Sequence, residues 1–266
     1  LLERCRGLTA KLPTAEVGVA PHSLRAVTKN ELLAVAEMAG SAPIHIHIAE
    51  QTKEVDECRA WSGRRPVAWL LENAPVDERW CLVHATHVDE QEIVGMAKSG
   101  AVVGLCPVTE ANLGDGVFPL QDWMSQGGRF GVGSDSNVHI GVAAELSLLE
   151  YSQRLTHRAR NVVKRNHQST GRAIMDLALA GGAQALGGSA RIEQGGAADF
   201  VSLDAQHPAL CSRDGDALLD AWIFASAGNL VDCVWVAGRK IVAEGRHVAR
   251  DEIRTRFREV MKDLCR

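Results

Sequence analysis

Short apolar runs alternate with amphipathic stretches along the first two thirds of the chain. The runs, rich in Val, Ile and Leu, cover residues 16–20, 44–48, 80–84, 101–106 and 129–133. Each is followed by residues whose apolar positions recur at helical spacing. Strands that alternate with helices pair in parallel and are covered by helices on both faces. The pattern therefore predicts an α/β fold with a parallel sheet.

Local signals place the helices between these strands. Thr28 is followed three residues later by Glu31, a capping-box spacing that predicts a helix starting there. Gly100 stands where helices commonly end, after a helical stretch. The other helices are predicted over residues 51–60, 66–73, 89–98, 143–157 and 169–186.

The number of units indicates an incomplete barrel. Five strand–helix units fit before about residue 190, whereas a closed barrel of parallel strands has eight. An open edge of apolar parallel strands would be prone to aggregation. We therefore expect a (β/α)8 TIM-like barrel of which about strands 4–8 are present, with about three units upstream of Leu1.

The character of the sequence changes after Gly187. GGAADFVSLD is a glycine-punctuated strand, and VDCVWVAGRKIVAEGRHV contains two strands joined at Ala237-Gly238-Arg239. These are hairpin signals rather than strand–helix signals. We predict a barrel part over residues 1–190, a small β-sandwich-type module over 191–250 and a closing surface helix over 251–266.

Composition and charge narrow the class of protein. The 266 residues are 46% hydrophobic and 23% charged, with a net charge of −4. That balance offers no basic field for nucleic acid, and no apolar run is long enough to span a membrane. LLERCRGLTAKLP lacks a signal-peptide layout. The seven cysteines are scattered, which favours reduced thiols in a cytoplasmic protein.

Chemically useful side chains stand at the ends of three predicted strands. They are His47, His84 and Asp135. Parallel barrels gather their strand ends on one face, where barrel enzymes hold their chemistry. Imidazole nitrogen and carboxylate oxygen suit a divalent metal such as zinc. Glu50 follows His47 closely and can move protons on a water molecule there. The set predicts a metal-dependent hydrolase.

Each residue also has a purely structural explanation. His45 and His47 can be a buried hydrogen-bonded pair, with His45 packing or supporting the site from deeper in the strand. His84 alone is typical of a core histidine, and Asp135 alone is typical of a turn. Their common place at strand ends favours a site.

The segment GVAPHSLRAV suggests the kind of substrate. His22 follows the first predicted strand, and Arg25 lies three residues further on. Arginine binds a carboxylate through two parallel hydrogen bonds, so Arg25 suggests an acidic substrate. A solvated surface arginine explains it equally well. Asn137 and His139 are further candidates for the pocket wall, with a loop role as the alternative.

The motifs HIAE, VHATH and GSDS resemble the amidohydrolase superfamily, in particular its deaminase and chlorohydrolase branch. In that branch one divalent metal, usually zinc, is held by an HxH on strand one, a histidine on strand five and an aspartate on strand eight. The resemblance implies that His47 and Asp135 are metal ligands. It implies that Glu50 transfers protons and that His84 and Asp135 orient the attacking water. The HxH has no counterpart in these residues.

Within the branch, PHSLRAV, HIHIAEQTKEV and GSDSNVHIG are similar to the formimidoylglutamate deiminases of histidine degradation. The resemblance implies that His22 and Arg25 contact the substrate, and that N-formimino-L-glutamate and water give N-formyl-L-glutamate and ammonia. It also implies a homodimer. One alternative is a deaminase of an adenosine-type nucleoside. The other, favoured by the missing HxH, is a non-catalytic fragment or scaffold.

Overall fold

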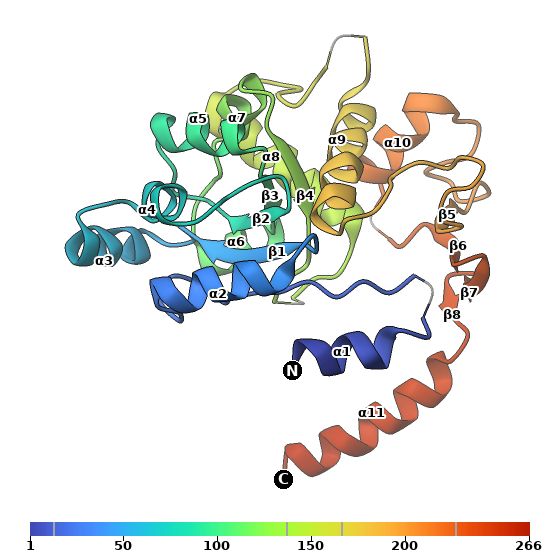
Figure 1. Cartoon of the computed structure of the whole chain (residues 1–266). Helices are drawn as coiled ribbons and strands as arrows, with labels where there is room; N and C mark the ends of the chain where they lie inside the picture. The colour runs from blue at the N-terminus through green and yellow to red at the C-terminus, as the bar shows by residue number, and fades with distance from the viewer. Residues whose placement is uncertain (13, 137, 166, 227) are drawn as a thin grey trace.

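The computed structural model describes all residues from 1 to 266 except 13, 137, 166 and 227. Its centre is a parallel sheet with the order β1-β2-β3-β4 (Figure 1). The strands are β1 (Ile44–Ile48), β2 (Trp80–His84), β3 (Val102–Leu105) and β4 (Arg129–Val132). The register pairs Ile48 with His84 and Leu105 with Val132. The carboxyl ends of the strands therefore lie at one edge of the sheet.

Most helices surround this sheet, whereas the first and the last lie at the periphery (Figure 1). The helices are α1 (Leu2–Thr9), α2 (Lys29–Ala39), α3 (Thr52–Ser62), α4 (Pro66–Asn73), α5 (Glu90–Ser99), α6 (Pro107–Leu113), α7 (Leu120–Ser125), α8 (Val142–His157), α9 (Thr170–Ala185), α10 (Gly215–Phe224) and α11 (Arg250–Leu264). The predicted capping box at Thr28 is confirmed, because its hydroxyl accepts from the N–H of Glu31. Asp89 caps α5 in the same way.

The core lies between the parallel sheet and its helices. Its largest fully buried side chains include Trp80, Trp123, Phe118 and Phe130. The indole N–H of Trp123 donates to the carbonyl of Arg129 at 3.0 Å, so this polar group is satisfied where it is buried. Burial of such large apolar surfaces is the main force that holds the helices on the sheet.

A second, antiparallel sheet has the order β5-β6-β7-β8. Its strands are β5 (Phe200–Leu203), β6 (Val231–Val236), β7 (Arg239–Ala243) and β8 (Arg246–His247). Ala237 and Gly238 join β6 to β7 with φ angles of 50° and 73°, the left-handed backbone that tight hairpins require. The predicted fold class, a partial parallel barrel followed by a small β module, is confirmed. The domain boundaries stay a prediction.

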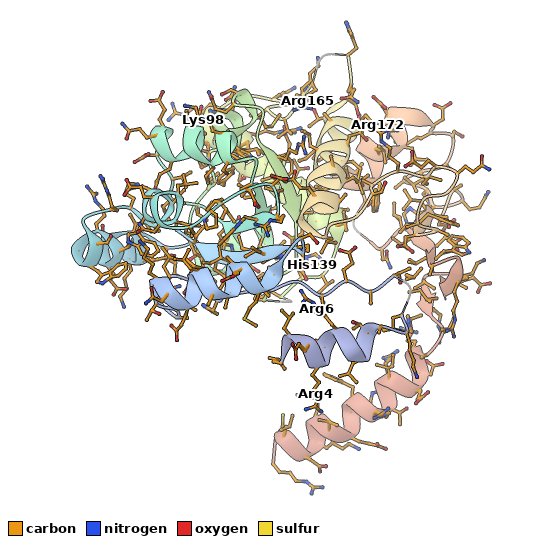
Figure 2. All side chains as sticks on the ribbon, in the orientation of Figure 1. Arg4, Arg6, Lys98, His139, Arg165 and Arg172 are labelled. Carbon is orange, nitrogen blue, oxygen red and sulfur yellow. The ribbon has the colours of Figure 1, made fainter. Side chains whose placement is uncertain are left out.

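Ion pairs and hydrogen bonds attach the peripheral helices (Figure 2). Arg172 on α9 contacts Asp216 on α10 at 3.0 Å, and Arg6 on α1 donates to the carbonyl of Ala39 at the end of α2. No residue is buried in α11, all of which the structure describes. Among the described residues, no helix combines the length and the apolar character needed to cross a membrane.

The strand predicted over residues 16–20 is wrong as a regular element. This segment lies along β1, but it pairs only through isolated bridges, Val19 with Ile44 and Ser23 with His47. Pro21 lacks the N–H that a continuous ladder needs between these bridges. The helices α6 and α7 were not predicted, because seven and six residues carry too little periodicity to distinguish a helix from a loop, and α10 was not predicted either.

Close packing of α9 on β4 gives a test of the core. A Cβ atom on Gly181 would overlap with the carbonyl group of Phe130, whereas one on Gly182 would meet nothing within 4 Å. We expect Gly181→Ala to lower the free energy of unfolding by about 1–3 kcal/mol through overpacking. Gly182→Ala, the matched control, should leave it unchanged or raise it by less than about 1 kcal/mol. Equal effects in urea titrations would show that the two glycines do not differ in packing.

Candidate active site

The candidate site begins where the parallel strands end. Ala49, His84, Ala85 and Asp135 all have left-handed φ angles, between 40° and 66°. Non-glycine residues seldom adopt this conformation, and it commonly marks functional sites where the surrounding structure holds it in place. The sharp turns at these positions allow side chains from β1, β2 and the loop after β4 to converge on one place.

His47 offers one free ring nitrogen to this place. Its Nδ1 lies 2.8 Å from the carbonyl oxygen of His22. A carbonyl only accepts, so Nδ1 carries the proton and Nε2 keeps a lone pair. The His47 ring lies 4.9 Å from the ring of His22 and 5.6 Å from that of His84, centre to centre. His22 thus orients His47 through its backbone and its ring.

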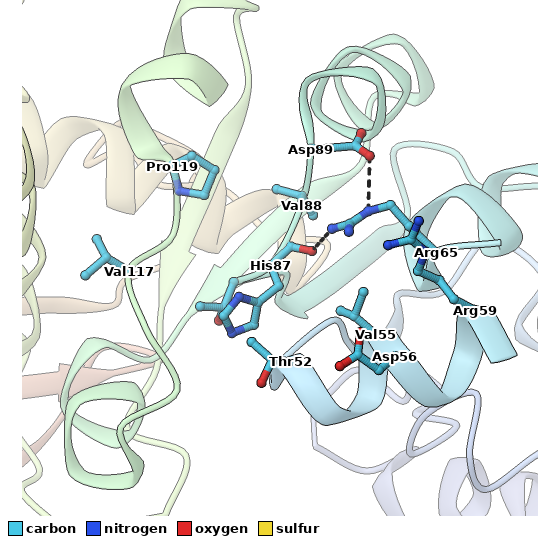
Figure 3. A pocket seen from close by; sticks show the side chains of 11 residues that line it. Thr52, Val55, Asp56, Arg59, Arg65, His87, Val88, Asp89, Val117 and Pro119 are labelled. Atoms are coloured by element: carbon cyan, nitrogen blue, oxygen red, sulfur yellow. Dashed lines mark hydrogen bonds and ion pairs between the residues drawn. The ribbon is translucent and has the colours of Figure 1, made fainter.

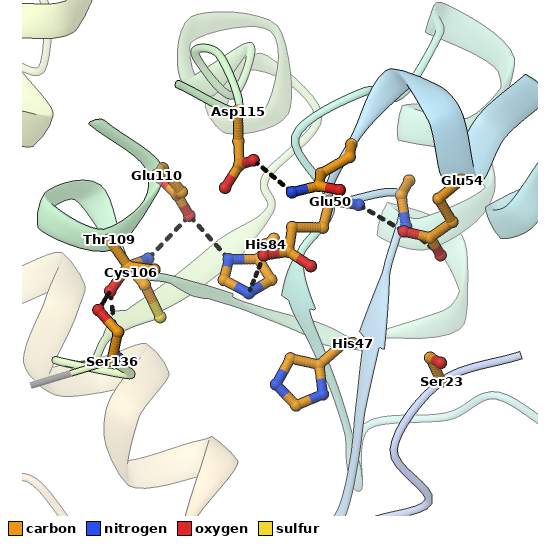
Figure 4. Close-up of polar contacts among 12 residues, drawn as sticks. Ser23, His47, Glu50, Glu54, His84, Cys106, Thr109, Glu110, Asp115 and Ser136 are labelled. Atoms are coloured by element: carbon orange, nitrogen blue, oxygen red, sulfur yellow. Dashed lines mark hydrogen bonds and ion pairs between the residues drawn. The ribbon is translucent and has the colours of Figure 1, made fainter. Parts of the chain in front are cut away.

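His84 is fully buried at the end of β2 (Figure 4). Its Nδ1 lies 3.2 Å from Oε1 of Glu110. Its Nε2 lies 3.7 Å from Oε1 of Glu50 and has no hydrogen-bond partner among the described residues. Burial acts to lower the pKa of His84, but the hydrogen bond and charge of Glu110, with the charges of Glu50 and Asp135, raise it overall.

Ligand-type atoms of His47, His84 and Asp135 meet in one place. One such atom from each lies within 4.8 Å of the others. His47 uses Nδ1 for a hydrogen bond to an oxygen, which is the usual support for an imidazole that binds a metal through Nε2. The buried, unpartnered Nε2 of His84 is the kind of orphaned atom that a water molecule beside the cation would satisfy. The nitrogen of His47 and the carboxylate of Asp135 suit zinc.

Glu50 is held in position by a carboxylate from the next helix. Glu54, in the first turn of α3, is buried and accepts from the N–H groups of Ala49 at 3.1 Å and Glu50 at 2.9 Å. These two bonds fix the backbone just beyond β1, including the left-handed Ala49. The side chain of Glu50 is 16% exposed, so it can exchange protons with a substrate while most of it remains shielded.

More buried acids surround the site. Asp115 accepts from the side-chain amide of Gln51 at 3.0 Å, and its other oxygen has no partner among the described residues. Glu145 accepts from the N–H of Val108 at 2.9 Å. Burial raises the pKa of Glu145, that hydrogen bond lowers it, and the charges of Glu110 and Asp135 raise it, which together bring the pKa to about 7. Several carboxylates close together attract a positive charge, so this site is suited to bind a cation.

The sequence-predicted residues do not all meet. The structure brings His47, His84 and Asp135 together, with Glu50 beside His84. Arg25 lies in an exposed turn and makes no hydrogen bond or ion pair with the described residues of this group. Its role in binding substrate stays a prediction, as do the roles of the others.

The remaining candidates that the structure describes, His45 and His139, are not part of this group. His45 hydrogen-bonds the carbonyl of Ala185 at 2.7 Å, as expected for a packing residue. His139 lines a cavity of about 900 Å³ between the end of β4 and the small β module, and Figure 2 marks its position. Asn137 lies outside the described residues.

A separate pocket of about 470 Å³ lies between α3 and the loop after β2 (Figure 3). Arg65 on its wall is occupied by Asp89 at 3.1 Å and Glu92 at 2.7 Å. His87 donates to the carbonyl of Asp115 at 2.7 Å and so ties this loop to the one after α6. The charge of Arg65 in this pocket is therefore already paired, and these pairs hold the loop in place.

Sequence reasoning missed Glu54 and Glu110. Glu110 follows β3 by five residues, on a helix that opens with Pro107. The available signal was its place after β3, because the ends of parallel strands are where such sites lie. For Glu54 the available signal was its place four residues after Glu50, in the first helical turn.

A parallel sheet that presents two histidines and an aspartate beyond its strand ends defines the class of α/β barrel proteins with a site on the carboxyl face. The model of the amidohydrolase family matches residues 6–241. The chain therefore belongs to the amidohydrolase family.

Individual relatives agree with this assignment. A formimidoylglutamate deiminase from Pseudomonas aeruginosa is 52% identical over 270 residues, which cover 99% of this chain and 59% of that protein. The crystal structure of an amidohydrolase from Brucella melitensis is 52% identical with a TM-score of 0.95, over 100% of this chain and 59% of that one. The chain thus spans about three fifths of the length of these relatives.

A more distant solved structure shares the fold. It is an adenosine deaminase from Xanthomonas campestris with bound zinc, 22% identical with a TM-score of 0.84, covering 98% of this chain and 61% of that one. At this identity the likeness concerns the fold alone.

The clamp on Glu50 can be tested through stability. Glu54→Gln replaces one accepting oxygen by an amide that opposes a backbone N–H, so we expect a loss of about 1–3 kcal/mol in the free energy of unfolding. Glu57→Gln is the control, because Glu57 is exposed and pairs only with Lys53 at 3.5 Å. It should change stability by less than about 0.5 kcal/mol. If chemical denaturation gives the same free energy of unfolding for both variants, Glu54 does not hold the backbone at Glu50.

Proposed function

We propose that this chain carries the catalytic face of a formimidoylglutamate deiminase, which hydrolyses N-formimino-L-glutamate to N-formyl-L-glutamate and ammonia in histidine catabolism. The observation that carries the proposal is the 52% identity over 99% of the chain to a relative of that name. The meeting of His47, His84 and Asp135 beside Glu50 supports hydrolysis as the chemistry.

The residues at the strand ends have separate roles in this proposal. His47 and Asp135 would hold one divalent cation, most suitably zinc. Such a cation lowers the pKa of a water molecule so that it attacks near neutral pH. The Nε2 of His84 faces the same place and would orient the attacking oxygen by a hydrogen bond. Asp135 would orient it from the opposite strand end.

Glu50 would carry the protons. Water contributes its oxygen to the formimino carbon, and the bond from this carbon to the terminal nitrogen breaks. In two successive transfers Glu50 takes each of the two protons of the water and delivers it to that nitrogen, so the nitrogen leaves as ammonia and the oxygen remains as the formyl carbonyl. The carboxylate thus acts first as a base and then as an acid, and it ends the cycle ionised. Its position 3.7 Å from Nε2 of His84 fits this shuttle.

The substrate has two carboxylates and needs a cationic partner. We propose Arg25 for one of them, with His22 beside it. Arg25 is exposed and makes no ion pair with the described residues, so its guanidinium is available. His22 lies next to the site through its contact with His47.

Cofactor, location and assembly belong to the same proposal. We propose zinc as the metal, the cytoplasm as the location and a homodimer as the assembly. All seven cysteines lie among the described residues and none forms a disulfide, which supports a reducing compartment. The exposed apolar side chains of Ile253, Phe257 and Val260 on α11 offer surface for a subunit contact.

The substrate assignment is tested by ammonia release from N-formimino-L-glutamate and from adenosine by the full-length gene product. We expect turnover of the first substrate only. Arg25→Ala should raise KM for it by about 10- to 100-fold, as expected for the loss of a charged hydrogen bond. Arg4→Ala, an exposed arginine on α1, is the control and should leave KM unchanged.

Other outcomes decide between the alternatives. Release of ammonia from adenosine alone would favour a nucleoside deaminase. No release from either substrate, together with no bound metal, would favour a non-catalytic scaffold. An unchanged KM in Arg25→Ala would remove the reason for an acidic substrate at this loop.

The proton shuttle has a prediction of its own. Glu50→Gln keeps the size of the side chain but cannot accept a proton, so kcat should fall by at least about 100- to 10,000-fold. Metal content, measured by atomic absorption, should stay near that of the unmodified protein because Glu50 is not a proposed ligand. Substantial remaining turnover would contradict the shuttle.

A further inference from the structure

A buried carboxylate stands directly behind His84, on the side away from Glu50 (Figure 4). Glu110 lies in α6, and its side chain is 6% exposed. Its Oε1 is 3.2 Å from Nδ1 of His84 and 2.9 Å from the backbone nitrogen of Cys106. One oxygen thus accepts from the imidazole and from the chain that leaves β3.

We propose that Glu110 is a positioning residue for the hydrolysis, which fixes a proton of His84 on Nδ1 and so keeps Nε2 turned toward the reacting groups. The inference rests on the proposed function for its catalytic consequence. Its structural part, the tautomer of His84, does not depend on any substrate.

The geometry supports a fixed rather than a passing contact. The backbone N–H of Cys106 can only donate, so Oε1 of Glu110 is already committed as an acceptor. The proton between this oxygen and His84 therefore belongs to Nδ1. Glu110 itself is anchored, because α6 begins with Pro107 immediately after Cys106 and Glu110 lies in its first turn.

The left-handed backbone of His84 makes such an anchor necessary. With φ at 66°, His84 sits at the start of a sharp turn, and the hydrogen bond to Glu110 adds to burial in fixing its ring. Nε2 has no partner of its own among the described residues, so the hydrogen bond to Glu110 is what orients the ring in the absence of other ligands. Supporting carboxylates of this kind often affect activity about 10- to 100-fold.

The test compares three variants of the full-length gene product. Glu110→Met removes the acceptor while keeping the length of the side chain, and Glu110→Gln keeps an accepting oxygen without the charge. Glu150→Gln is the matched control, since Glu150 is fully buried on α8 and accepts from the N–H groups of Val162 and Val163 at 3.0 Å.

Two readouts are measured for each variant. The first is kcat and KM for ammonia release from N-formimino-L-glutamate. The second is the 15N chemical shift of the His84 ring nitrogens in metal-depleted protein at alkaline pH, where the neutral ring reports its tautomer. Loss of the signal in His84→Asn assigns it.

For Glu110→Met we expect kcat to fall about 10- to 100-fold with KM changed less than about threefold, and the Nδ1–H tautomer to lose its dominance. Glu110→Gln should restore the tautomer and most of kcat. Glu150→Gln should lower stability but change neither kcat nor the tautomer. If Glu110→Met does not fold, Glu110→Asp takes its place, because it withdraws the oxygen by one methylene and the same results are expected.

A folded Glu110→Met variant that keeps the Nδ1–H tautomer, or a kcat within about threefold of the unmodified protein, would overturn the proposal. Equal loss of kcat in Glu110→Met and Glu150→Gln would reduce Glu110 to a structural role and also overturn it. If the unmodified protein releases no ammonia from this substrate, the proposed function fails, whereas the tautomer measurement still decides whether Glu110 holds His84.

Discussion

The parallel register of the central sheet is the constraint on which the rest of the structure depends. Because Ile48 pairs with His84 and β4 continues the same alignment, the strand ends form one edge. Left-handed residues just beyond that edge turn the chain abruptly, so side chains far apart in sequence reach a common place. A slip of one residue between strands would turn every side chain to the opposite face and separate these groups.

Carboxylates from the helices that follow the strands stabilise this edge. Glu54 binds the backbone beyond β1, and Glu110 binds both His84 and the backbone beyond β3. The energetic logic is that a buried acid is tolerated where it satisfies several donors at once. Both acids lie in the helix that follows their strand and hydrogen-bond groups next to the site.

Much of the framework was predictable because its signals are local. The capping box at Thr28, the β-branched run of β1 and the hairpin at Ala237–Gly238 each depend on residues close in sequence. The strand expected over 16–20 failed because Pro21 prevents a continuous ladder, an effect that depends on where the neighbouring strand lies. The short helices α6 and α7 were not predicted, because tertiary packing and not sequence periodicity determines them.

The sequence by itself determined the α/β class and indicated His47, His84, Asp135 and Glu50 as candidates at the strand ends. Only the tertiary structure decided that three of them share one ligand-sized space, that Arg25 makes no ion pair there, and that Glu110 stands behind His84. The reason is physical. Strand and helix propensities act over a few residues, whereas a hydrogen bond between residues 26 positions apart exists only after the sheet has aligned them.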